Sequence, residues 1–366
     1  MRTRTLTFGR FPDYRVVAAK LLLTAGALTL ILTSCGESAA RKRTPAAKAE
    51  PLLAFTDGYV WDGDVWVVGD DFRASRLGAG TGSDWSPDGR SLVYWTHDAL
   101  VVWDVSSGRR RELVRTDAAA EGEGFTPEAD WAPQGDRIGF VYASGKSLVR
   151  LAKTGLFGGE IPFAWAPDGH TLAYSQCDLV GPGAHGEFDC TVYGVRDTGA
   201  HRRKLIQQHF SETKLAWSPD GRFLAVHATL RSGPDEGDYI QGSDGLYLVD
   251  LERGRTSRVS RATGEGFSWS AHGGQFAYAT QYRNASAVMV SSADGKRART
   301  LLRSTRVSYG ELAWSHDGSM IAAAVSRSGP GYAPSAAGLQ ILDARSGTIL
   351  HRVAGGYVSS PSWRPR

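Results

Sequence analysis

The chain has 366 residues, of which 42% are hydrophobic and 22% charged, and its formal net charge is +4. Residues 1–34 carry five basic side chains and one acidic one, and residues 35–50 carry four basic and two acidic ones, so residues 51–366 have a net charge of −2. A nucleic-acid-binding domain needs a clustered basic surface, and this balance gives no support for one.

Residues 1–34 are predicted to be an export signal. Basic residues precede an apolar run at 21–32, which is too short to span a bilayer comfortably. The following Leu32-Thr33-Ser34-Cys35 resembles the lipobox of bacterial lipoproteins, and this resemblance implies that Cys35 is lipidated and anchors the chain on the extracytoplasmic face of the cell membrane. The alternative is a plain secretory signal with an incidental cysteine. Residues 35–50 lack apolar periodicity and are expected to form a flexible tether.

One motif recurs through residues 51–366. In its clearest copy, Asp84–Tyr94, a Ser-Pro-Asp-Gly turn lies between a tryptophan and an alternating apolar run. Six full copies and one truncated copy at the C-terminus centre on Trp85, Trp131, Trp165, Trp217, Trp269, Trp314 and Trp363. The spacing runs from 34 residues between the second and third tryptophans to 52 between the third and fourth, close to the roughly 40–50 of a four-stranded propeller blade.

The residues around each tryptophan predict a tight turn followed by a strand. Glycine occupies the same place in all six full copies, as a turn with positive φ requires. After each turn, two apolar residues stand two positions apart, such as Leu92 and Tyr94, which places both on one face of a strand. The tryptophans and the Asp-Gly turns are therefore interpreted as structural residues and not as catalytic ones.

A second series of apolar segments predicts seven further strands. These segments lie at 65–68, 100–104, 148–151, 192–195, 246–250, 288–290 and 339–343. Both series together predict an all-β fold, a seven-bladed β-propeller with four-stranded antiparallel blades over residues 51–366. The strand around Tyr357–Trp363 is expected to pair with the N-terminal blade, at about 52–78, and to close the ring.

The pattern Trp-Ser-Pro-Asp-Gly-Arg-x-Leu-x-Tyr at Trp85–Tyr94 resembles the WD-like repeat of TolB and TolB-like proteins, and of the propellers attached to prolyl-oligopeptidase-type peptidases. The resemblance covers nearly all of residues 51–366 and implies a propeller fold. The chain departs from TolB in three expected features: seven blades in place of six, no α/β domain before the propeller, and a lipid anchor. A propeller fold does not by itself determine function.

Two cysteines remain once Cys35 is assigned to the lipid. Cys177 and Cys190 are expected to form a disulfide, because disulfides persist in exported domains. Free thiols and metal ligands are the alternatives, and no second cysteine or nearby histidine completes a zinc site.

Three enlarged loops are predicted at 178–189, 231–244 and 327–338, and all three should lie on the face opposite the Trp-bearing turns. The candidate partner-binding residues on this long-loop face are His185, Asp235, Glu236, Asp238, Tyr239, Asp244 and Tyr332. His209 is a candidate for the central channel. The acids do not follow the ligand order of a calcium-binding loop, and no metal or other cofactor is predicted.

The motifs of common hydrolases are missing from the sequence, which has neither Gly-x-Ser-x-Gly nor His-Glu-x-x-His. The sequence therefore predicts a monomeric, non-enzymatic interaction module that binds another cell-envelope protein on its long-loop face and binds no nucleic acid. The alternatives are a propeller that binds or processes a small molecule or glycan in its central channel, and a sensor subunit of a membrane system.

Overall fold

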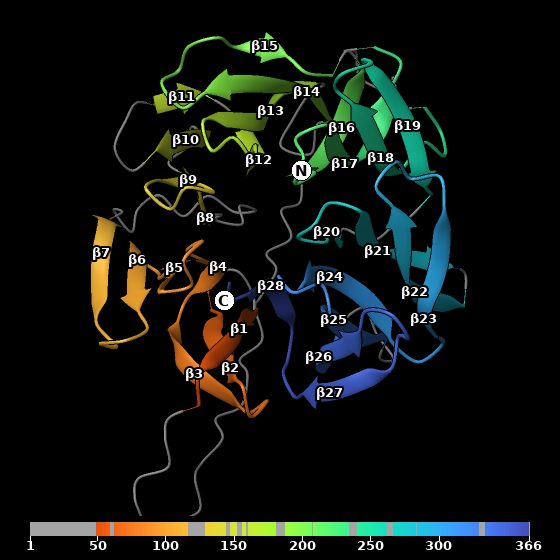
Figure 1. Ribbon diagram of the computed structural model, residues 1–366. Helices are drawn as coiled ribbons and strands as arrows, with labels where there is room; N and C mark the ends of the chain where they lie inside the picture. The colour runs from red at the N-terminus through yellow and green to blue at the C-terminus, as the bar shows by residue number, and fades with distance from the viewer. Residues whose placement is uncertain are drawn as a thin grey trace, which may run out of the picture. The chain divides into compact units, whose positions relative to one another are not determined.

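The computed structural model (Figure 1) describes residues 49–58, 62–115, 129–143, 147–151, 156–158, 160–180, 187–206, 208–233, 240–261, 266–282, 284–328 and 334–365. These ranges contain strands and turns and no helix, so the all-β prediction is confirmed. In the same ranges, no helix exists that is long and apolar enough to cross a membrane. The predicted signal and Cys35 lie outside the described residues.

The described strands form antiparallel sheets of four strands, apart from one sheet of eight. The first sheet combines both ends of residues 51–366 and contains β28 (Val358–Trp363), β1 (Pro51–Asp57), β2 (Asp64–Gly69) and β3 (Ala74–Ala79). The next two contain β4 (Thr81–Trp85), β5 (Ser91–Trp95), β6 (Ala99–Asp104) and β7 (Arg110–Arg115), then β8 (Ala129–Trp131), β9 (Ile138–Ala143), β10 (Ser147–Leu151) and β11 (Leu156–Gly158).

The eight-stranded sheet follows, with β12 (Glu160–Trp165), β13 (Thr171–Val180), β14 (Glu187–Arg196), β15 (Arg203–Lys204), β16 (His209–Trp217), β17 (Phe223–Arg231), β18 (Gly245–Asp250) and β19 (Arg255–Ser260). The strand pairing between its two halves, β12–β15 and β16–β19, consists of a single residue pair, Cys190 of β14 with Phe210 of β16. The last two sheets contain β20 (Phe267–Trp269), β21 (Gln275–Tyr282), β22 (Ala285–Ser292) and β23 (Ala298–Ser304), then β24 (Ser308–Trp314), β25 (Met320–Ser328), β26 (Pro334–Asp343) and β27 (Ile349–Val353).

The repeated turns have the backbone that their glycines predicted. In all six full copies the glycine has a φ between 63° and 74°, a conformation that other residues adopt only with strain. The serine before the proline also belongs to the turn, since the Ser86 hydroxyl donates to Asp88 at 2.7 Å and accepts from the Ser91 N–H at 2.9 Å. The turn is therefore fixed by side-chain hydrogen bonds as well as by glycine.

Most of the repeat tryptophans connect one Trp-bearing strand to the next. In four of them the indole N–H donates, over 3.0–3.3 Å, to the carbonyl oxygen of the residue just before the previous tryptophan, in the pairs Trp165–Asp130, Trp217–Ala164, Trp269–Ala216 and Trp363–Ala313. The Trp85 indole donates at 3.0 Å to the carbonyl of Ser362, the residue before the last tryptophan, Trp363. Trp314 instead donates to Gly318 in its own turn. One repeated side chain thus provides both buried apolar area and a directed contact between neighbouring strands.

The pairing of β28 with β1 brings the end of the chain to residue 51. Trp363 faces Leu53 in this ladder, and both pack with Phe55 and Ile341 in one buried apolar cluster. Beyond the strand, the Arg364 guanidinium donates to the Gly89 carbonyl at 2.6 Å and lies 2.7 Å from the Glu50 carboxylate. Strands from the two ends of this region therefore share one core.

Asp84 connects three of the Trp-bearing strands. Its carboxylate on β4 accepts a hydrogen bond from the Trp131 N–H of β8 and another from the Ser362 hydroxyl of β28, both at 3.0 Å. Burial among these strands raises the pKa of Asp84 to about 6, against an ordinary value of 3.8, and the hydrogen bonds offset only part of that rise.

Replacing Asp84 with asparagine should alter the pH dependence of stability. Because the folded pKa lies above the unfolded one, the contribution of Asp84 to stability falls as the pH rises from about 4 to about 6. That loss is at most about 3 kcal/mol, and Asp84→Asn removes it. Urea unfolding measured across this range should show the variant gaining stability relative to the wild type as the pH rises. Parallel pH profiles for the two proteins would refute the prediction.

Candidate functional site

The candidate site lies where the β13–β14 hairpin meets β16 and β17. Cys177 and Cys190 face each other across the hairpin and form the disulfide that the sequence predicted. Cys190 also pairs with Phe210, and both are buried in an apolar cluster that includes Leu224. The disulfide and this cluster hold β14, β16 and β17 together. They thereby fix the positions of the polar side chains nearby on these strands.

Three charged or ionisable residues at these strand ends form what we call the Asp189 cluster: Asp189 of β14, His209 at the start of β16 and Arg231 at the end of β17. His209 Nδ1 lies 2.9 and 3.0 Å from the two carboxylate oxygens of Asp189, and Arg231 Nε lies 3.8 Å from the same carboxylate. His209 and Arg231 are also direct partners in the β16–β17 ladder. The register of that ladder therefore places the imidazole and the guanidinium beside one acid.

Burial differs sharply across the Asp189 cluster. The Arg231 side chain is fully inaccessible and that of Asp189 is 11% exposed, whereas the His209 side chain is 33% exposed. A buried guanidinium requires a compensating anion, which Asp189 supplies. His209 is thus the member that a ligand can reach.

The contacts of His209 define its chemical capacity. A carboxylate only accepts hydrogen bonds, so the pairing with Asp189 places a proton on Nδ1 and leaves Nε2 of the neutral ring as an acceptor. The ring can accept a hydrogen bond from a bound ligand or take up a proton at Nε2. The site is suited to polar recognition and to proton transfer.

The structure corrects the sequence-based description of this face. His209, the candidate for the central channel, is bound to Asp189. The loop predicted at 178–189 is too long, because β13 continues to Val180 and β14 begins at Glu187, with Asp178 paired to Asp189. The loop predicted at 327–338 is shortened for the same reason, since β25 reaches Ser328 and β26 begins at Pro334.

Of the seven candidate partner-binding residues, Asp244 is the one within the described ranges. Its carboxylate lies 3.9 Å from His227 Nε2, its backbone carbonyl accepts a hydrogen bond from Arg258, and its side chain is partly exposed. The other six, His185, Asp235, Glu236, Asp238, Tyr239 and Tyr332, lie outside the described residues. In the ranges that are described, no three residues among His, Cys, Asp and Glu are grouped to hold a metal ion.

Removing the disulfide should destabilise the protein. In a Cys35→Ala background, Cys177→Ser with Cys190→Ser frees the hairpin, and the expected loss is about 3 kcal/mol of unfolding free energy for a closed loop of this size. Urea unfolding in the presence and absence of a reductant measures it. The reductant should weaken the Cys35→Ala protein and leave the triple variant unchanged, so an equal effect on both would rule out the bond as the cause.

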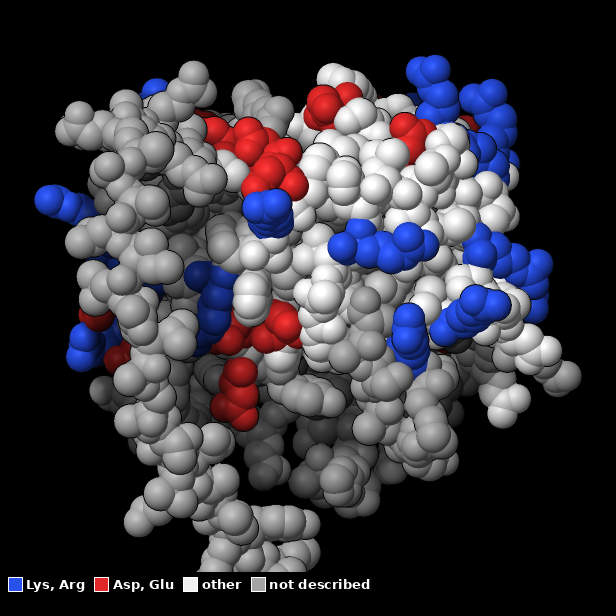
Figure 2. Space-filling view, turned by 90° about the horizontal axis from the view of Figure 1, so that it is seen from below, with Lys and Arg blue, Asp and Glu red and all other residues white. Residues whose placement is uncertain are grey.

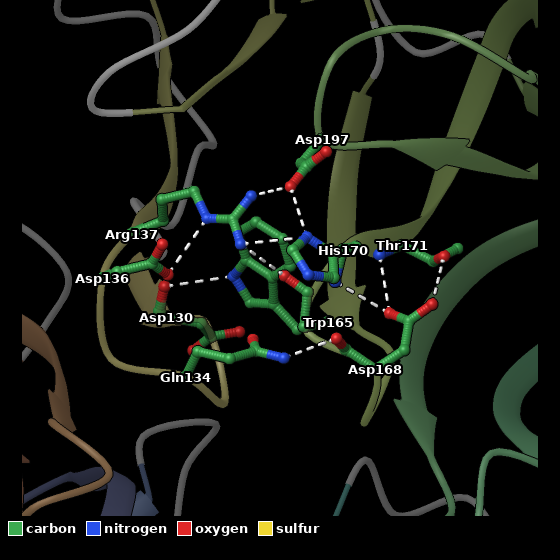
Figure 3. A network of polar contacts seen from close by, with 10 residues as sticks. Asp130, Gln134, Asp136, Arg137, Trp165, Asp168, His170, Thr171 and Asp197 are labelled. Carbon is green, nitrogen blue, oxygen red and sulfur yellow. Dashed lines mark hydrogen bonds and ion pairs between the residues drawn. The ribbon is translucent and has the colours of Figure 1, made fainter.

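A second polar network joins the turns that follow Trp131 and Trp165 (Figure 3). Arg137 forms an ion pair with the buried Asp197 and donates to the Gly169 carbonyl at 3.2 Å, and His170 Nδ1 lies 2.9 Å from Asp197. Asp168 accepts hydrogen bonds from the Thr171 N–H and hydroxyl, which lower its pKa despite partial burial. These groups bind one another, and we interpret the network as a joint between neighbouring turns.

Comparisons with known proteins agree on the fold. No family model matches the chain. The Bacillus subtilis (strain 168) protein named uncharacterized peptidase YuxL is 26% identical over 211 residues, which cover 52% of this chain and 28% of that relative. TolB from Acinetobacter baumannii matches with a TM-score of 0.50 and 15% identity over 86% of this chain and 67% of its own. A puromycin-hydrolyzing peptidase from Mycobacterium tuberculosis matches with a TM-score of 0.55 and 12% identity over 83% and 53%.

These findings overturn one prediction. The absence of hydrolase motifs suggested that the chain is not an enzyme, but the curated relative and one of the structural matches are named peptidases. The absence of these motifs does not exclude catalysis, because catalytic geometry can be assembled from residues far apart in sequence. The chain spans little more than a quarter of the curated relative's length, so that protein's activity is not assigned to it by similarity. The antiparallel sheets and the structural matches together show that the chain has a TolB-like β-propeller fold.

Proposed function

We propose that this chain is a polypeptide-binding β-propeller that holds a segment of another protein at the Asp189 cluster. The observation that carries the proposal is the contact of His209 with Asp189 beside the buried Arg231, because it presents one partly exposed polar side chain on a rigid, disulfide-braced base. Preorganised polar groups of this kind give specificity at low entropic cost. The similarity to proteins named peptidases supports a polypeptide as the ligand.

The architecture proposed for this function is a closed ring of seven four-stranded blades. Three observations support it: the eight-stranded sheet divides at a single residue pair, β28 pairs with β1, and the Trp85 indole donates to the Ser362 carbonyl. The first divides the eight strands into two groups of four, the second completes a group of four from both ends of residues 51–366, and the third connects that group to the next one. A closed ring leaves no long sheet edge between its first and last blades and fixes the loops on each face.

The location proposed is the extracytoplasmic face of the cell membrane, with the propeller tethered through a lipid on Cys35. The lipobox-like Leu32–Cys35 and the disulfide between Cys177 and Cys190 support this location, since disulfides persist outside the cytoplasm. The partner would then be another protein of the cell envelope, bound to a monomeric propeller.

Crosslinking in intact cells, followed by a binding measurement on the purified pair, tests the proposal. The site variant is His209→Gln, and the matched control is His272→Gln, at an exposed histidine in the turn after Trp269. The wild type and the control should bind the same envelope protein with equal affinity, and His209→Gln should bind at least about tenfold more weakly, as expected for loss of one polar contact in a site. Equal binding by all three proteins would contradict the proposal.

Peptide hydrolysis is a second candidate, favoured by the His209–Asp189 pair. In this reaction His209 Nε2 takes a proton from water, the resulting hydroxide adds to the peptide carbonyl, and the proton passes to the departing amine. Release of new amino groups from a peptide mixture measures the reaction. His209→Gln should lower the rate by about 10²-fold or more, whereas an unchanged rate would exclude His209 as the base.

A further inference from the structure

The outer strands β23 and β27 carry a concentration of positive charge that the overall net charge conceals. We call the surface formed by segments 294–306 and 343–353 the basic edge. Its cations are all exposed: Lys296, Arg297, Arg299, Arg303, Arg306, Arg345 and Arg352. The same segments contain two acids, Asp294 and Asp343. Since residues 51–366 have a net charge of −2, the charges are strongly segregated.

The two segments of the basic edge form one continuous surface. The Arg299 guanidinium donates to the Ala344 carbonyl at 3.0 Å. The turn before β27 also packs closely on β23, because a Cβ at Gly347 would lie 2.1 Å from the Leu301 carbonyl oxygen. In Figure 2, Lys and Arg side chains gather on the right-hand side of the view. The two segments are therefore in direct contact.

The two acids of the basic edge are occupied by their own turns. The Asp294 carboxylate accepts from the Ser292 hydroxyl at 2.7 Å and from the Lys296 N–H at 3.2 Å, and it lies 3.4 Å from the Lys296 ammonium group. The Asp343 carboxylate accepts from the N–H and the hydroxyl of Ser346, both at 2.7 Å. These turn contacts lower the pKa of both carboxyl groups. Both carboxylates are thus bound within their own turns, and the cations of the basic edge are exposed to solvent.

Exposed apolar side chains accompany this charge. Among the described residues, four large hydrophobic side chains are exposed, and two of them lie at the basic edge: Leu350 of β27 is 43% exposed, and Tyr282 at the end of β21 is 49% exposed. The Arg303 guanidinium lies 5.3 Å from the centre of the Tyr282 ring. Aromatic and aliphatic groups among cations suit the boundary between lipid headgroups and acyl chains.

We propose that the basic edge binds the surface of an anionic phospholipid membrane. Outer strands often carry charge to prevent pairing with other sheets, but a few charges of either sign are sufficient for that purpose. Here one sign dominates over two neighbouring edges, and Leu350 and Tyr282 add apolar contact. Each Lys or Arg near an anionic bilayer contributes about 1 kcal/mol, so several of them together produce stable attachment without a lipid anchor. The proposal does not depend on the peptide-binding role or on Cys35.

Vesicle co-sedimentation tests the proposal with the full chain carrying Cys35→Ala, which prevents acylation. The edge variant combines Lys296→Gln, Arg297→Gln and Arg352→Gln. A matched control removes three exposed arginines from other outer strands and turns, with Arg109→Gln, Arg111→Gln and Arg255→Gln. Each protein is mixed with vesicles containing phosphatidylglycerol and with pure phosphatidylcholine vesicles, at about 0.1 M salt and again at higher salt. Binding to the neutral vesicles measures the contribution of the apolar N-terminal segment.

The basic edge should raise binding to the anionic vesicles above that to the neutral ones, and high salt should remove the difference. We expect the edge variant to lose about 30-fold or more of the anionic preference and the control to lose less than about threefold. Leu350→Ser should weaken binding to anionic vesicles and leave its salt dependence unchanged. Three outcomes would overturn the proposal: equal losses in both triple variants, no anionic preference in the parent protein, or tight binding to a soluble polyanion such as DNA with none to vesicles.

Discussion

Trp363→Ala is expected to lower the free energy of unfolding by about 4 kcal/mol, as is typical of removing a buried tryptophan. The side chain is 5% exposed, it packs against Leu53 and Phe55, and its indole donates to the Ala313 carbonyl at 3.0 Å. The substitution therefore opens a cavity in the core shared by β1, β28 and the last sheet. Urea unfolding followed by fluorescence and by circular dichroism measures the loss.

Phenylalanine substitutions separate the hydrogen bond from the packing. Trp363→Phe keeps most of the apolar volume but leaves the Ala313 carbonyl without its donor, which should cost about 1–2 kcal/mol beyond the change in volume. Trp131 provides the control, because within the described residues its buried indole N–H has no acceptor. Trp131→Phe should cost less than Trp363→Phe. The reverse order would mean that the indole contacts between repeats contribute little.

Asp189→Ala is expected to destabilise the protein by about 3–5 kcal/mol, because it removes a carboxylate from beside a buried guanidinium. Arg231 is fully inaccessible, and the Asp189 carboxylate lies 3.8 Å from its Nε. Denaturant unfolding near neutral pH gives the value. The loss should exceed that of His209→Ala, since His209 is one-third exposed and water can replace its contact.

A double variant checks the cause of this loss. If Asp189→Ala is harmful because Arg231 remains charged, adding Arg231→Met should restore much of the lost stability. If the two losses simply add, the residues do not act as a pair, and the Asp189 cluster would need another explanation. Recovery of the disulfide in both variants, measured by thiol titration, confirms that the hairpin still forms.

Much of the fold follows from local sequence. The turn after each tryptophan was predictable because glycine and serine act within a few residues of one another, and the observed positive φ at Gly89 and its counterparts confirms it. The second series of apolar segments also corresponds to strands, from β2 at its start to β26 at its end. The ends of strands without such turn or apolar signals were predicted less well. In the β13–β14 hairpin the strands continue past the apolar residues, because backbone pairing extends to Asp178 and Asp189.

The candidate site could not be predicted in the same way. Asp189, His209 and Arg231 come from three strands, and the sequence gives no local reason for them to meet. Their meeting depends on the register of β16 with β17 and on the one ladder pair between β14 and β16. The basic edge was concealed for a related reason, because net charge is a sum over residues 51–366 and carries no information on which strands share a surface.

The pairing of β28 with β1 has a consequence for synthesis. Pro51–Asp57 leaves the ribosome early, but Val358–Trp363 follows about 300 residues later, so one edge of β1 remains open while most of the chain is made. A nascent or prematurely terminated chain lacks the strand that covers this edge. Such chains are exposed to aggregation and proteolysis, and only a chain translated to Trp363 can complete its first sheet.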